Sequence, residues 1–306
     1  MLVNKSNLQE IFTNLKTTFH KAFDAAPVIW PSIAMLVPSG SSQNDYKWLS
    51  QFPRMRKWIG EKVIKALEGF GYAITNDDWE ATIGVRRNDI EDDNLGIYAP
   101  MAQSAGESAK QLPDEIVADL VNGVFVNTCY DKQYFCDTDH PVGDGNGGVL
   151  SVSNKLTVAL SAASQAAAIA SIGAARTMMA KFKDDEGRPL NIVGDTLMVP
   201  PALEDIANVL ANNTNLEDGK PNPYKGTIKV VMNPRMTSDT AWMLLCTSKA
   251  VKPFIYQERK KPGFVSQTDM NADGVFMRAE YKYGAEARAA GGYAFWQLCV
   301  GSTGTN

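Results

Sequence analysis

The apolar residues at the start of the chain recur at the spacing of an α-helix. Ser6 and Gln9 have the spacing of a capping box. The apolar positions that follow this spacing are Leu8, Ile11, Phe12, Leu15, Phe19 and Phe23. This pattern predicts an amphipathic helix that ends near Pro27. Three prolines within residues 27–38 then favour an extended arm, because proline cannot continue a helix for long.

Residues 46–93 contain two limbs of opposite charge. Residues 46–65 carry six basic side chains and one acidic side chain, whereas residues 77–93 carry seven acidic side chains and two arginines. The alternating stretch WEATIGVRR (79–87) and the turn-prone NDD (76–78) predict a long two-stranded hairpin. Two interpretations stay open. The opposite charges pair across the hairpin, at under ~1 kcal/mol for each exposed pair, or they pair with a neighbouring subunit.

The predicted hairpin also holds three of the six tryptophans of the chain. A projecting element has no core of its own in which to bury such side chains, and tryptophan and arginine are enriched in protein interfaces. We therefore predict an assembly interface that consists of Trp48, Arg54, Arg56, Lys57, Trp58 and Trp79.

The strongest helical pattern follows Pro100. Its apolar stripe runs from Leu112 to Phe125, and Pro113 either opens this helix or kinks it. A helix rich in alanine and serine over 161–182, the strand-like DTLMVP (195–200) and a short helix over 201–210 suggest a layered α/β unit. Proline and glycine breaks divide the remainder mostly into strands and loops.

The composition is that of an ordinary folded protein. The 306 residues are 44% hydrophobic and 21% charged, with a net charge of -4, and they can form one large domain or two moderate ones. This balance argues against a nucleic-acid-binding protein, which needs clustered Lys and Arg. We see no signal peptide and no run of the ~20 apolar residues that a spanning helix needs. The chain is expected to be soluble and cytoplasmic, with its four cysteines as reduced thiols.

The stretch GDGNGG (143–148) matches the letters of the dinucleotide-binding fingerprint GxGxxG. Such a site also needs a hydrophobic strand before the glycines and a helix after them, because the helix amino terminus holds the pyrophosphate. Here the polar DTDHPV precedes the glycines and the β-prone VLSVSNKLTV follows them. We therefore interpret the stretch as a glycine-rich surface loop.

The stretch CYDKQYFCDTDHPV (129–142) contains the best potential metal ligands, which are Cys129, Cys136 and His140. Structural zinc sites normally use a shorter Cys–Cys spacing and four ligands, and the nearby aspartates lack the spacing of a calcium loop. Neither histidine of the chain, His20 or His140, has a recognisable nucleophile and orienting acid. We predict no cofactor, metal or catalytic site. The alternative is a cation- or nucleotide-dependent enzyme built on the loop from Cys129 to Gly148.

Several stretches together resemble one family, the Mu-like phage major head subunit. They are DYKWLSQFPRMRKWIGEK (45–62), IEDDNLGIYAP (90–100), LPDEIVADLVNG (112–123), CYDKQYFCDTDHPV (129–142), LMVPPALEDIA (197–207) and EYKYGAEARAAGGYAFWQL (280–298). Their order and spacing cover nearly the whole chain. The resemblance implies an α+β protein with the tailed-phage major capsid fold.

The resemblance also implies a division of the chain. It places an N-terminal arm at 1–36, an E-loop hairpin with flanking strands at 37–95, and a P domain with the spine helix at 96–157. An A domain follows at 158–290, and residues 291–306 form a return strand to the P domain. The charged hairpin is then the E-loop that lies over an adjacent subunit, and residues 143–148 are a loop after the spine helix.

The function implied by the resemblance is that of a virion shell protein without enzymatic activity. It assembles with itself through pentamers and hexamers into an icosahedral head around double-stranded DNA, in the cytoplasm of a bacterial host. The portal and a scaffold or maturation protease are the implied partners, and no membrane is involved. We expect the DNA to be held by confinement, because the chain is mildly acidic. A cellular compartment shell of the same fold, with protein cargo, is a further alternative.

Overall fold

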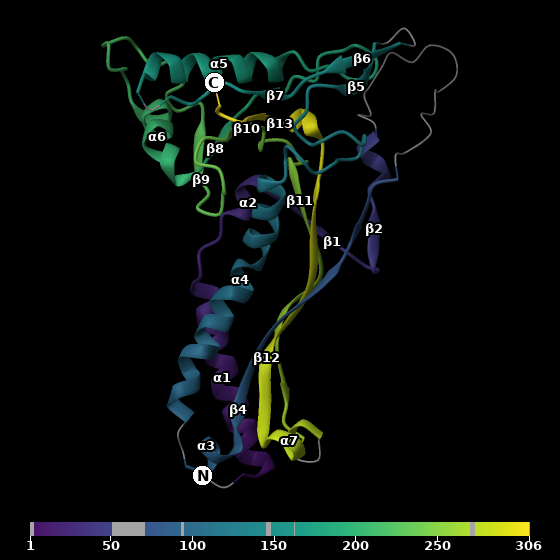
Figure 1. Cartoon of the computed structure of the whole chain (residues 1–306), viewed down its shortest axis with the longest axis vertical. Coiled ribbons are helices and arrows are strands. Elements are labelled where there is room, and N and C mark those ends of the chain that lie inside the picture. The colour runs from purple at the N-terminus through teal and green to yellow at the C-terminus, as the bar shows by residue number, and fades with distance from the viewer. Residues whose placement is uncertain are drawn as a thin grey trace.

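The computed structural model describes residues 3–50, 71–92, 95–144, 148–161, 163–269 and 273–305. The molecule is elongated: two long helices lie along a four-stranded sheet, and a five-stranded sheet lies at one end (Figure 1). The N-terminus is at the opposite end of the molecule from this sheet, whereas the C-terminus is beside it (Figure 1). This mixture of helices and sheets confirms the predicted α+β class.

The four-stranded sheet has the order β1-β11-β12-β4. Its strands are β1 (Ala34–Pro38), β11 (Phe254–Gln267), β12 (Glu280–Tyr293) and β4 (Asp77–Arg86). β1 is parallel to β11, and the other neighbours are antiparallel. Small residues on β12 allow helix α4 (Ala99–Asn122) to lie close to the sheet, since a Cβ on Gly291 would come within 2.7 Å of Ile116.

Helix α1 (Lys5–Ala25) packs against α4 on the half of the molecule away from the five-stranded sheet (Figure 1). The predicted apolar stripe is confirmed, with Leu8, Ile11, Leu15, Phe19 and Ala22 buried. The two helices approach closely at Gly106, where a Cβ would lie 2.3 Å from the carbonyl oxygen of Phe19. The predicted capping box is wrong, because the side chain of Asn4 accepts the hydrogen bond from the backbone N–H of Asn7 and caps the helix.

Helix α4 is continuous, with Pro113 inside it, so this proline does not open the helix. The next residue, Asp114, is buried, and its carboxylate accepts hydrogen bonds from the backbone N–H groups of Ile29 (3.0 Å) and Trp30 (2.6 Å). These bonds fix the single-turn helix α2 (Trp30–Ile33) beside α4. The segment after Pro27 is therefore one helical turn followed by strand β1. This agrees with the prediction that its prolines prevent a long helix.

The predicted hairpin of residues 46–93 differs in the described part of the chain. β2 (Gln43–Asp45) pairs with β3 (Ala73–Thr75) over only three residue pairs. The stretch WEATIGVRR forms β4, as predicted, but its partner is β12, over ten residue pairs. Since β2 is polar and β12 is largely buried, β12 is the strand that can cover the apolar face of β4. Asp78 of β4 consequently forms an ion pair with Arg288 of β12, at 2.6 Å.

The five-stranded sheet has the order β7-β13-β10-β8-β9. Its strands are β7 (Lys155–Leu156), β13 (Cys299–Ser302), β10 (Trp242–Leu245), β8 (Thr196–Val199) and β9 (Lys229–Met232). Helices α5 (Gln165–Ala180) and α6 (Glu204–Asn212) accompany it, which confirms the predicted order of helix, strand and helix. Every residue of β8 and β10 is buried, because these apolar strands lie inside the sheet.

The domain boundaries that the resemblance implied stay a prediction, and each of the two sheets draws strands from more than one of these domains. β11 and β12, expected within the A domain at 158–290, form the centre of the four-stranded sheet. The chain then crosses over, and its last strand, β13, pairs with β10 in the five-stranded sheet. The physical reason is that Cys299 and Val300 are fully buried and match the apolar strand β10.

Short elements lie between these strands and helices. They are η1 (Lys47–Ser50), α3 (Arg87–Glu91), η2 (Leu95–Tyr98), β5 (His140–Gly143), β6 (Val149–Val152), η3 (Pro201–Leu203), α7 (Asp273–Arg278) and η4 (Trp296–Leu298). α7 is a helix where strand or loop was expected.

The buried apolar residues form two cores. The first core fills the five-stranded sheet and continues between α4 from Leu112 onward and the adjoining ends of β11 and β12. The second core lies at the other end of the molecule, where α1 and the first half of α4 cover β4, β11 and β12. No helix in the described part of the chain is long and apolar enough to cross a membrane.

Candidate assembly surface and the buried Cys129–Asp131–His140 cluster

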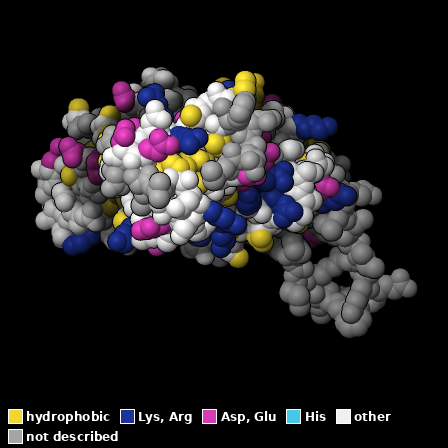
Figure 2. All heavy atoms as spheres, turned by 90° about the horizontal axis from the view of Figure 1, so that it is seen from below, with side chains coloured by type: hydrophobic (Ala, Val, Ile, Leu, Met, Phe, Trp, Pro, Cys, Tyr) yellow, Lys and Arg dark blue, Asp and Glu magenta, His cyan; other side chains and the backbone are white. Residues whose placement is uncertain are grey.

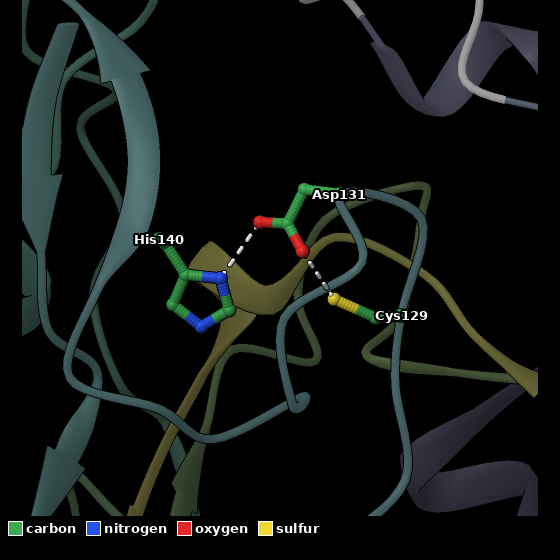
Figure 3. A group of neighbouring side chains, drawn as sticks. All are labelled: Cys129, Asp131 and His140. Carbon is green, nitrogen blue, oxygen red and sulfur yellow. Dashed lines mark hydrogen bonds and ion pairs between the residues drawn. The ribbon is translucent and has the colours of Figure 1, made fainter.

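Cys129, Asp131 and His140 meet in the first core, in the loop that follows α4 (Figure 3). The Cys129 thiol donates to Oδ1 of Asp131 (3.0 Å), and Oδ2 of Asp131 lies 2.7 Å from Nδ1 of His140. All three side chains are buried. The predicted ligand set is therefore only partly brought together: Asp131, which the sequence did not single out, joins Cys129 and His140, whereas Cys136 turns towards Cys299.

Asn154 and Trp296 complete the surroundings of His140. Asn154 Nδ2 donates to the carbonyl oxygens of Phe135 (2.8 Å), Trp296 (3.2 Å) and Cys299 (3.1 Å). Its Oδ1 lies 3.1 Å from Nε2 of His140, and the imidazole stacks on the Trp296 indole with ring centroids 4.1 Å apart. The network therefore ties the loop after α4 to η4 and β13.

The electrostatics of the cluster favour a carboxylate beside a neutral thiol. Burial raises the pKa of Asp131, but hydrogen bonds from His140 and Cys129 outweigh it, so the pKa lies below its usual value. Burial first, and the Asp131 carboxylate second, raise the pKa of the Cys129 thiol well above its usual value. A protonated thiol is a poor nucleophile and a poor metal ligand.

The three groups could supply one sulfur, one oxygen and one nitrogen ligand, since their ligand atoms all lie within 4.8 Å of one another. A structural zinc site normally takes four ligands. In the arrangement described, each group instead satisfies a neighbour by a hydrogen bond, which is how buried polar groups are stabilised. The thiol contacts the carboxylate and not the imidazole, so it lacks the adjacent base that activates a catalytic cysteine. The geometry is that of a structural network.

The stretch GDGNGG connects two strands. β5 ends at Gly143, β6 begins at Val149, and these two residues are register partners. The backbone N–H of Gly148 donates to Oδ1 of Asp144 (2.8 Å), as is typical of a turn; residues 145–147 lie outside the described residues. A strand, and not a helix, follows the glycines, and the next helix begins at Gln165. The described residues therefore lack the strand–glycine–helix order of a dinucleotide site, and the surface loop stays a prediction for residues 145–147.

Of the predicted interface residues, Arg54, Arg56, Lys57 and Trp58 lie outside the described residues. Trp48 and Trp79 are half-buried against the first core of their own chain. The Trp48 ring packs edge-on against Phe295 (5.6 Å between centroids), and Nε1 of Trp79 donates to the carbonyl oxygen of Ala289 (3.0 Å). These two tryptophans have a core of their own, contrary to the argument from a projecting hairpin.

Trp79 nevertheless lines a surface pocket of about 160 Å³ between β4, β12 and α4. Its apolar lining includes Ala81, Ala109, Ala285, Ala287 and Leu112. Three carboxylates surround it: Glu80 from β4, Glu115 from α4 and Glu286 from β12. The pocket lies where the two cores meet. The sequence does not reveal the pocket, because the pairing of β4 with β12 brings Glu80 and Glu286 together from distant parts of the chain.

Two of these carboxylates stand directly opposite each other. Glu80 and Glu286 are register partners on neighbouring strands, a placement that destabilises a sheet when both are charged. Lys260 forms an ion pair with Glu286 (2.8 Å), and the Thr82 hydroxyl donates to Glu80. The site is a small acidic depression with one indole wall, which suits a basic or aromatic group from outside.

Comparison with known proteins identifies the family. The model of the Mu-like prophage major head subunit gpT matches residues 8–168, 156–236 and 232–305. The chain is 31% identical over 307 residues to the major capsid protein of Escherichia phage Mu, covering 99% of this chain and 76% of the relative. It is 29% identical over 291 residues to the Mu-like prophage FluMu major head subunit of Haemophilus influenzae, covering 95% of this chain and 71% of the relative.

A solved structure agrees with these relatives. The procapsid of bacteriophage JBD30 contains a chain that is 34% identical, with a TM-score of 0.61, covering 98% of this chain and 76% of that one. The fold is therefore that of tailed-phage capsid proteins, and the chain is a structural component of the virion shell and not an enzyme. On both sequence and structure, the chain belongs to the Mu-like prophage major head subunit family.

Proposed function

We propose that this capsid subunit assembles through pentamers and hexamers into an icosahedral shell around double-stranded DNA. We further propose that residues 54–58 of one copy bind the acidic pocket of a neighbouring copy. Assembly takes place in the host cytoplasm, with a portal and a scaffold or maturation protease as partners. The relatives named above, all phage or prophage shell proteins, support this over a compartment shell with protein cargo.

Charge complementarity is the observation that carries the proposed contact. Residues 54–58 contain three basic side chains and no acidic one. The pocket presents Glu80, Glu115 and Glu286, and among the described residues only Lys260 forms an ion pair with one of them. A basic side chain from a neighbour would separate the opposed Glu80 and Glu286, and oppositely charged patches fix the register of two surfaces.

Trp79 and Trp48 then have different parts in the interface. Trp79 lines the pocket, so it belongs to the receiving surface. Trp48 packs on Phe295 and precedes residues 54–58 in the chain, so it anchors the approach to this segment on its own subunit. Arg54, Arg56, Lys57 and Trp58 supply the inserted charges and the indole.

A double charge reversal tests the inserted side. Arg54→Glu with Arg56→Glu should leave the thermal melting curve of the subunit unchanged, while like charges at every contact prevent closure of the shell. Electron microscopy under assembly conditions would show no shells. Normal shells would remove these arginines from the interface, and a collapsed melting transition would place them in a core.

A charge exchange tests the receiving side. Adding Glu80→Lys and Glu115→Lys to the same chain restores opposite charges between copies, so shells should return if the two surfaces meet. Lys181→Glu with Lys183→Glu is the matched control for Arg54→Glu with Arg56→Glu, since it reverses two exposed charges beyond the end of α5. If shells are lost with Arg54→Glu and Arg56→Glu and do not return in the four-residue variant, the segment contributes to the interface but does not bind this pocket.

The domain roles follow the two sheets. The four-stranded sheet with α4 corresponds to the P domain and its spine helix, and the five-stranded sheet with α5 and α6 corresponds to the A domain. In this assignment β11 and β12 belong to the P domain, and β13 closes the A domain. Limited proteolysis of the subunit should cut first at the exposed residues 248–250, between β10 of the five-stranded sheet and β11 of the four-stranded sheet.

The DNA is held by confinement. The net charge is -4, and at the end of the molecule seen in Figure 2 basic and acidic side chains are interspersed, without a uniformly basic face. Binding to phosphate backbones requires clustered positive charge. The isolated subunit should bind duplex DNA weakly at physiological salt, which a mobility-shift titration measures; tight binding would contradict confinement.

A further inference from the structure

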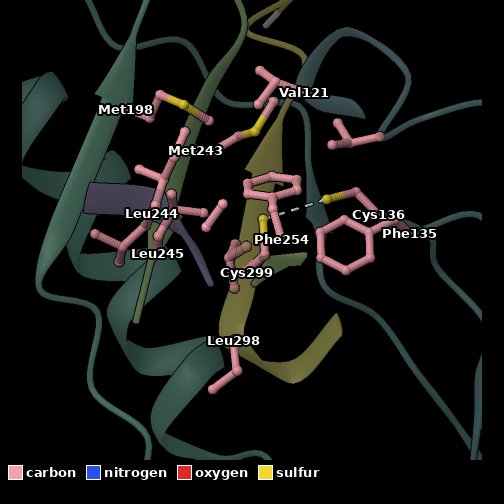
Figure 4. Close-up of a cluster of buried hydrophobic side chains, with 14 of the residues drawn as sticks. Val121, Phe135, Cys136, Met198, Met243, Leu244, Leu245, Phe254, Leu298 and Cys299 are labelled. Carbon is pink, nitrogen blue, oxygen red and sulfur yellow. Dashed lines mark hydrogen bonds between the residues drawn. The ribbon is translucent and has the colours of Figure 1, made fainter. Parts of the chain in front are cut away.

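The thiols of Cys136 and Cys299 face each other inside the first core (Figure 4). Their Sγ atoms are 3.7 Å apart, and both side chains are fully buried. The residues are separated by 163 positions, so the fold alone brings them together. A disulfide has an S–S distance of about 2.05 Å, so the sulfurs need to approach by less than about 2 Å.

Three contacts hold the two residues in place. The backbone N–H of Cys136 donates to the carbonyl oxygen of Val124 (2.8 Å), at the end of the long helix. Asn154 Nδ2 donates to the carbonyl oxygen of Cys299 (3.1 Å) and lies 3.9 Å from the Cys136 sulfur. Gly301 provides room, since a Cβ there would lie 2.7 Å from that sulfur. The pair is therefore a defined feature of the packing.

We propose that Cys136 and Cys299 are a modification site that takes an intrachain disulfide by exchange with a small-molecule disulfide such as oxidised glutathione. One cysteine loses its proton and attacks the small disulfide, which gives a mixed disulfide and releases one small thiol. The second cysteine loses its proton and attacks the protein sulfur of the mixed disulfide, which releases the second small thiol. Two protein thiols are oxidised and one small disulfide is reduced.

Burial determines the rate of this exchange. It raises the pKa of the Cys136 thiol well above its ordinary value, so few thiolates exist while the core is closed. Oxidation therefore proceeds through transiently opened molecules and is slow. Once formed, the bond encloses residues 137–298 and stabilises the fold by restricting the unfolded chain.

The bond would connect the loop after α4 to the last strand of the five-stranded sheet. In a reducing cytoplasm the thiols persist, whereas in an oxidising medium the disulfide accumulates. A shell that leaves its host would therefore become more stable after release. This timing rests on the proposed function, whereas the bond itself can be tested on the isolated subunit.

The test uses Cys129→Ala with Cys246→Ala, a variant that retains only the facing pair. It is unfolded and refolded in a glutathione redox buffer, quenched with acid, denatured and treated with an alkylating agent. We expect both thiols to be protected, a cross-linked peptide that contains residues 136 and 299, and a melting temperature about 10 °C above that of the reduced protein. Dithiothreitol should reverse all three results.

Matched variants and the unmodified chain keep the test decisive. Made in the otherwise unmodified chain, Cys136→Ala and Cys299→Ala should each leave three reactive thiols and no rise in melting temperature. The same peptide mapping on the unmodified chain covers the case in which the double variant does not fold. Since refolding removes burial as a barrier, two alkylated thiols at positions 136 and 299, or a different cysteine pairing, would overturn the proposal.

Discussion

The first core and the second core of this subunit differ in how the chain closes them. The first core draws on segments from almost the whole described sequence, and its largest buried side chains include Trp242, Trp296 and Tyr256. The second core is smaller, and helix α1 covers one side of it with Leu8, Ile11 and Phe19. The second core thus depends on one helix from the start of the chain.

The junction between the cores is the acidic pocket. Its alanines leave a gap between the apolar side chains of the two cores, and its glutamates bring charge to that gap. Regions with fewer buried apolar contacts open at lower free energy than the rest of a protein. We infer that the second core opens first, and that the pocket marks the boundary of the part that opens.

Trp296→Ala should give the largest loss of stability and should act on the whole chain. The indole is almost fully buried, stacks on His140 and meets Phe182 edge-on with ring centroids 5.2 Å apart. Removing a large buried aromatic ring costs about 4 kcal/mol. Urea unfolding followed by circular dichroism should show one transition at a lower midpoint. Trp48→Ala, which removes a half-buried indole from the same core, should cost less; an equal cost would contradict this description of the core.

Phe19→Ala should cost about 3 kcal/mol, but only in the second core. The ring is fully buried and lies 5.1 Å from the ring of Phe264, between centroids. Hydrogen exchange should accelerate in α1 and in the far ends of β4 and β12, while the amides of β8 and β10 keep their protection. Uniform acceleration would show that the two cores unfold as one. Phe12→Ala, at a half-buried ring that stacks on the same phenylalanine, is the milder control.

Asp131→Asn should cost about 2 kcal/mol at pH 7 and should change the pH dependence of the first core. The pKa of Asp131 in the folded protein lies below its usual value, so its carboxylate stabilises the fold above the unfolded-state pKa of about 4. That contribution is lost as the pH falls through the lower folded-state pKa. Urea titrations between pH 2 and 7 should therefore show a shallower acid loss in the variant.

Asp218→Asn is the control for this pH dependence. Lys220 lowers the pKa of Asp218 as well, but this carboxylate is solvated, and exposed ion pairs contribute little to stability. The control should match the unmodified chain at every pH. If both variants lose the same stability, burial of the cluster does not explain the contribution of the Asp131 carboxylate to the free energy of unfolding.

The sequence predicted local elements better than it predicted their partners. The stripe of α1, the long helix α4 and the β8 strand were visible because each is encoded by neighbouring residues. The pairing of β4 with β12 was not, since about two hundred residues separate strands whose alternating patterns fit many partners. The same limit applied to Asp131, which gains its role only when the fold places His140 beside it.

Glu80→Gln should give the smallest effect on the isolated subunit, and it should be favourable. Glu80 stands opposite Glu286 on the neighbouring strand, so removing one charge relieves a repulsion of about 0.5 kcal/mol. Glutamine still accepts the hydrogen bond from Thr82, which keeps the local geometry. Glu286→Gln is the matched variant at the other strand, and because it also loses the ion pair with Lys260, its net effect should be near zero.

If the pocket binds a basic segment of a neighbouring copy, Glu80→Gln should at the same time slow shell formation, measured by light scattering. A subunit that becomes more stable and assembles normally would show that the opposed glutamates have no part in the contact. A subunit that becomes more stable but assembles slowly would show that the repulsion between Glu80 and Glu286, which destabilises the isolated subunit, is part of the site that binds the neighbouring copy.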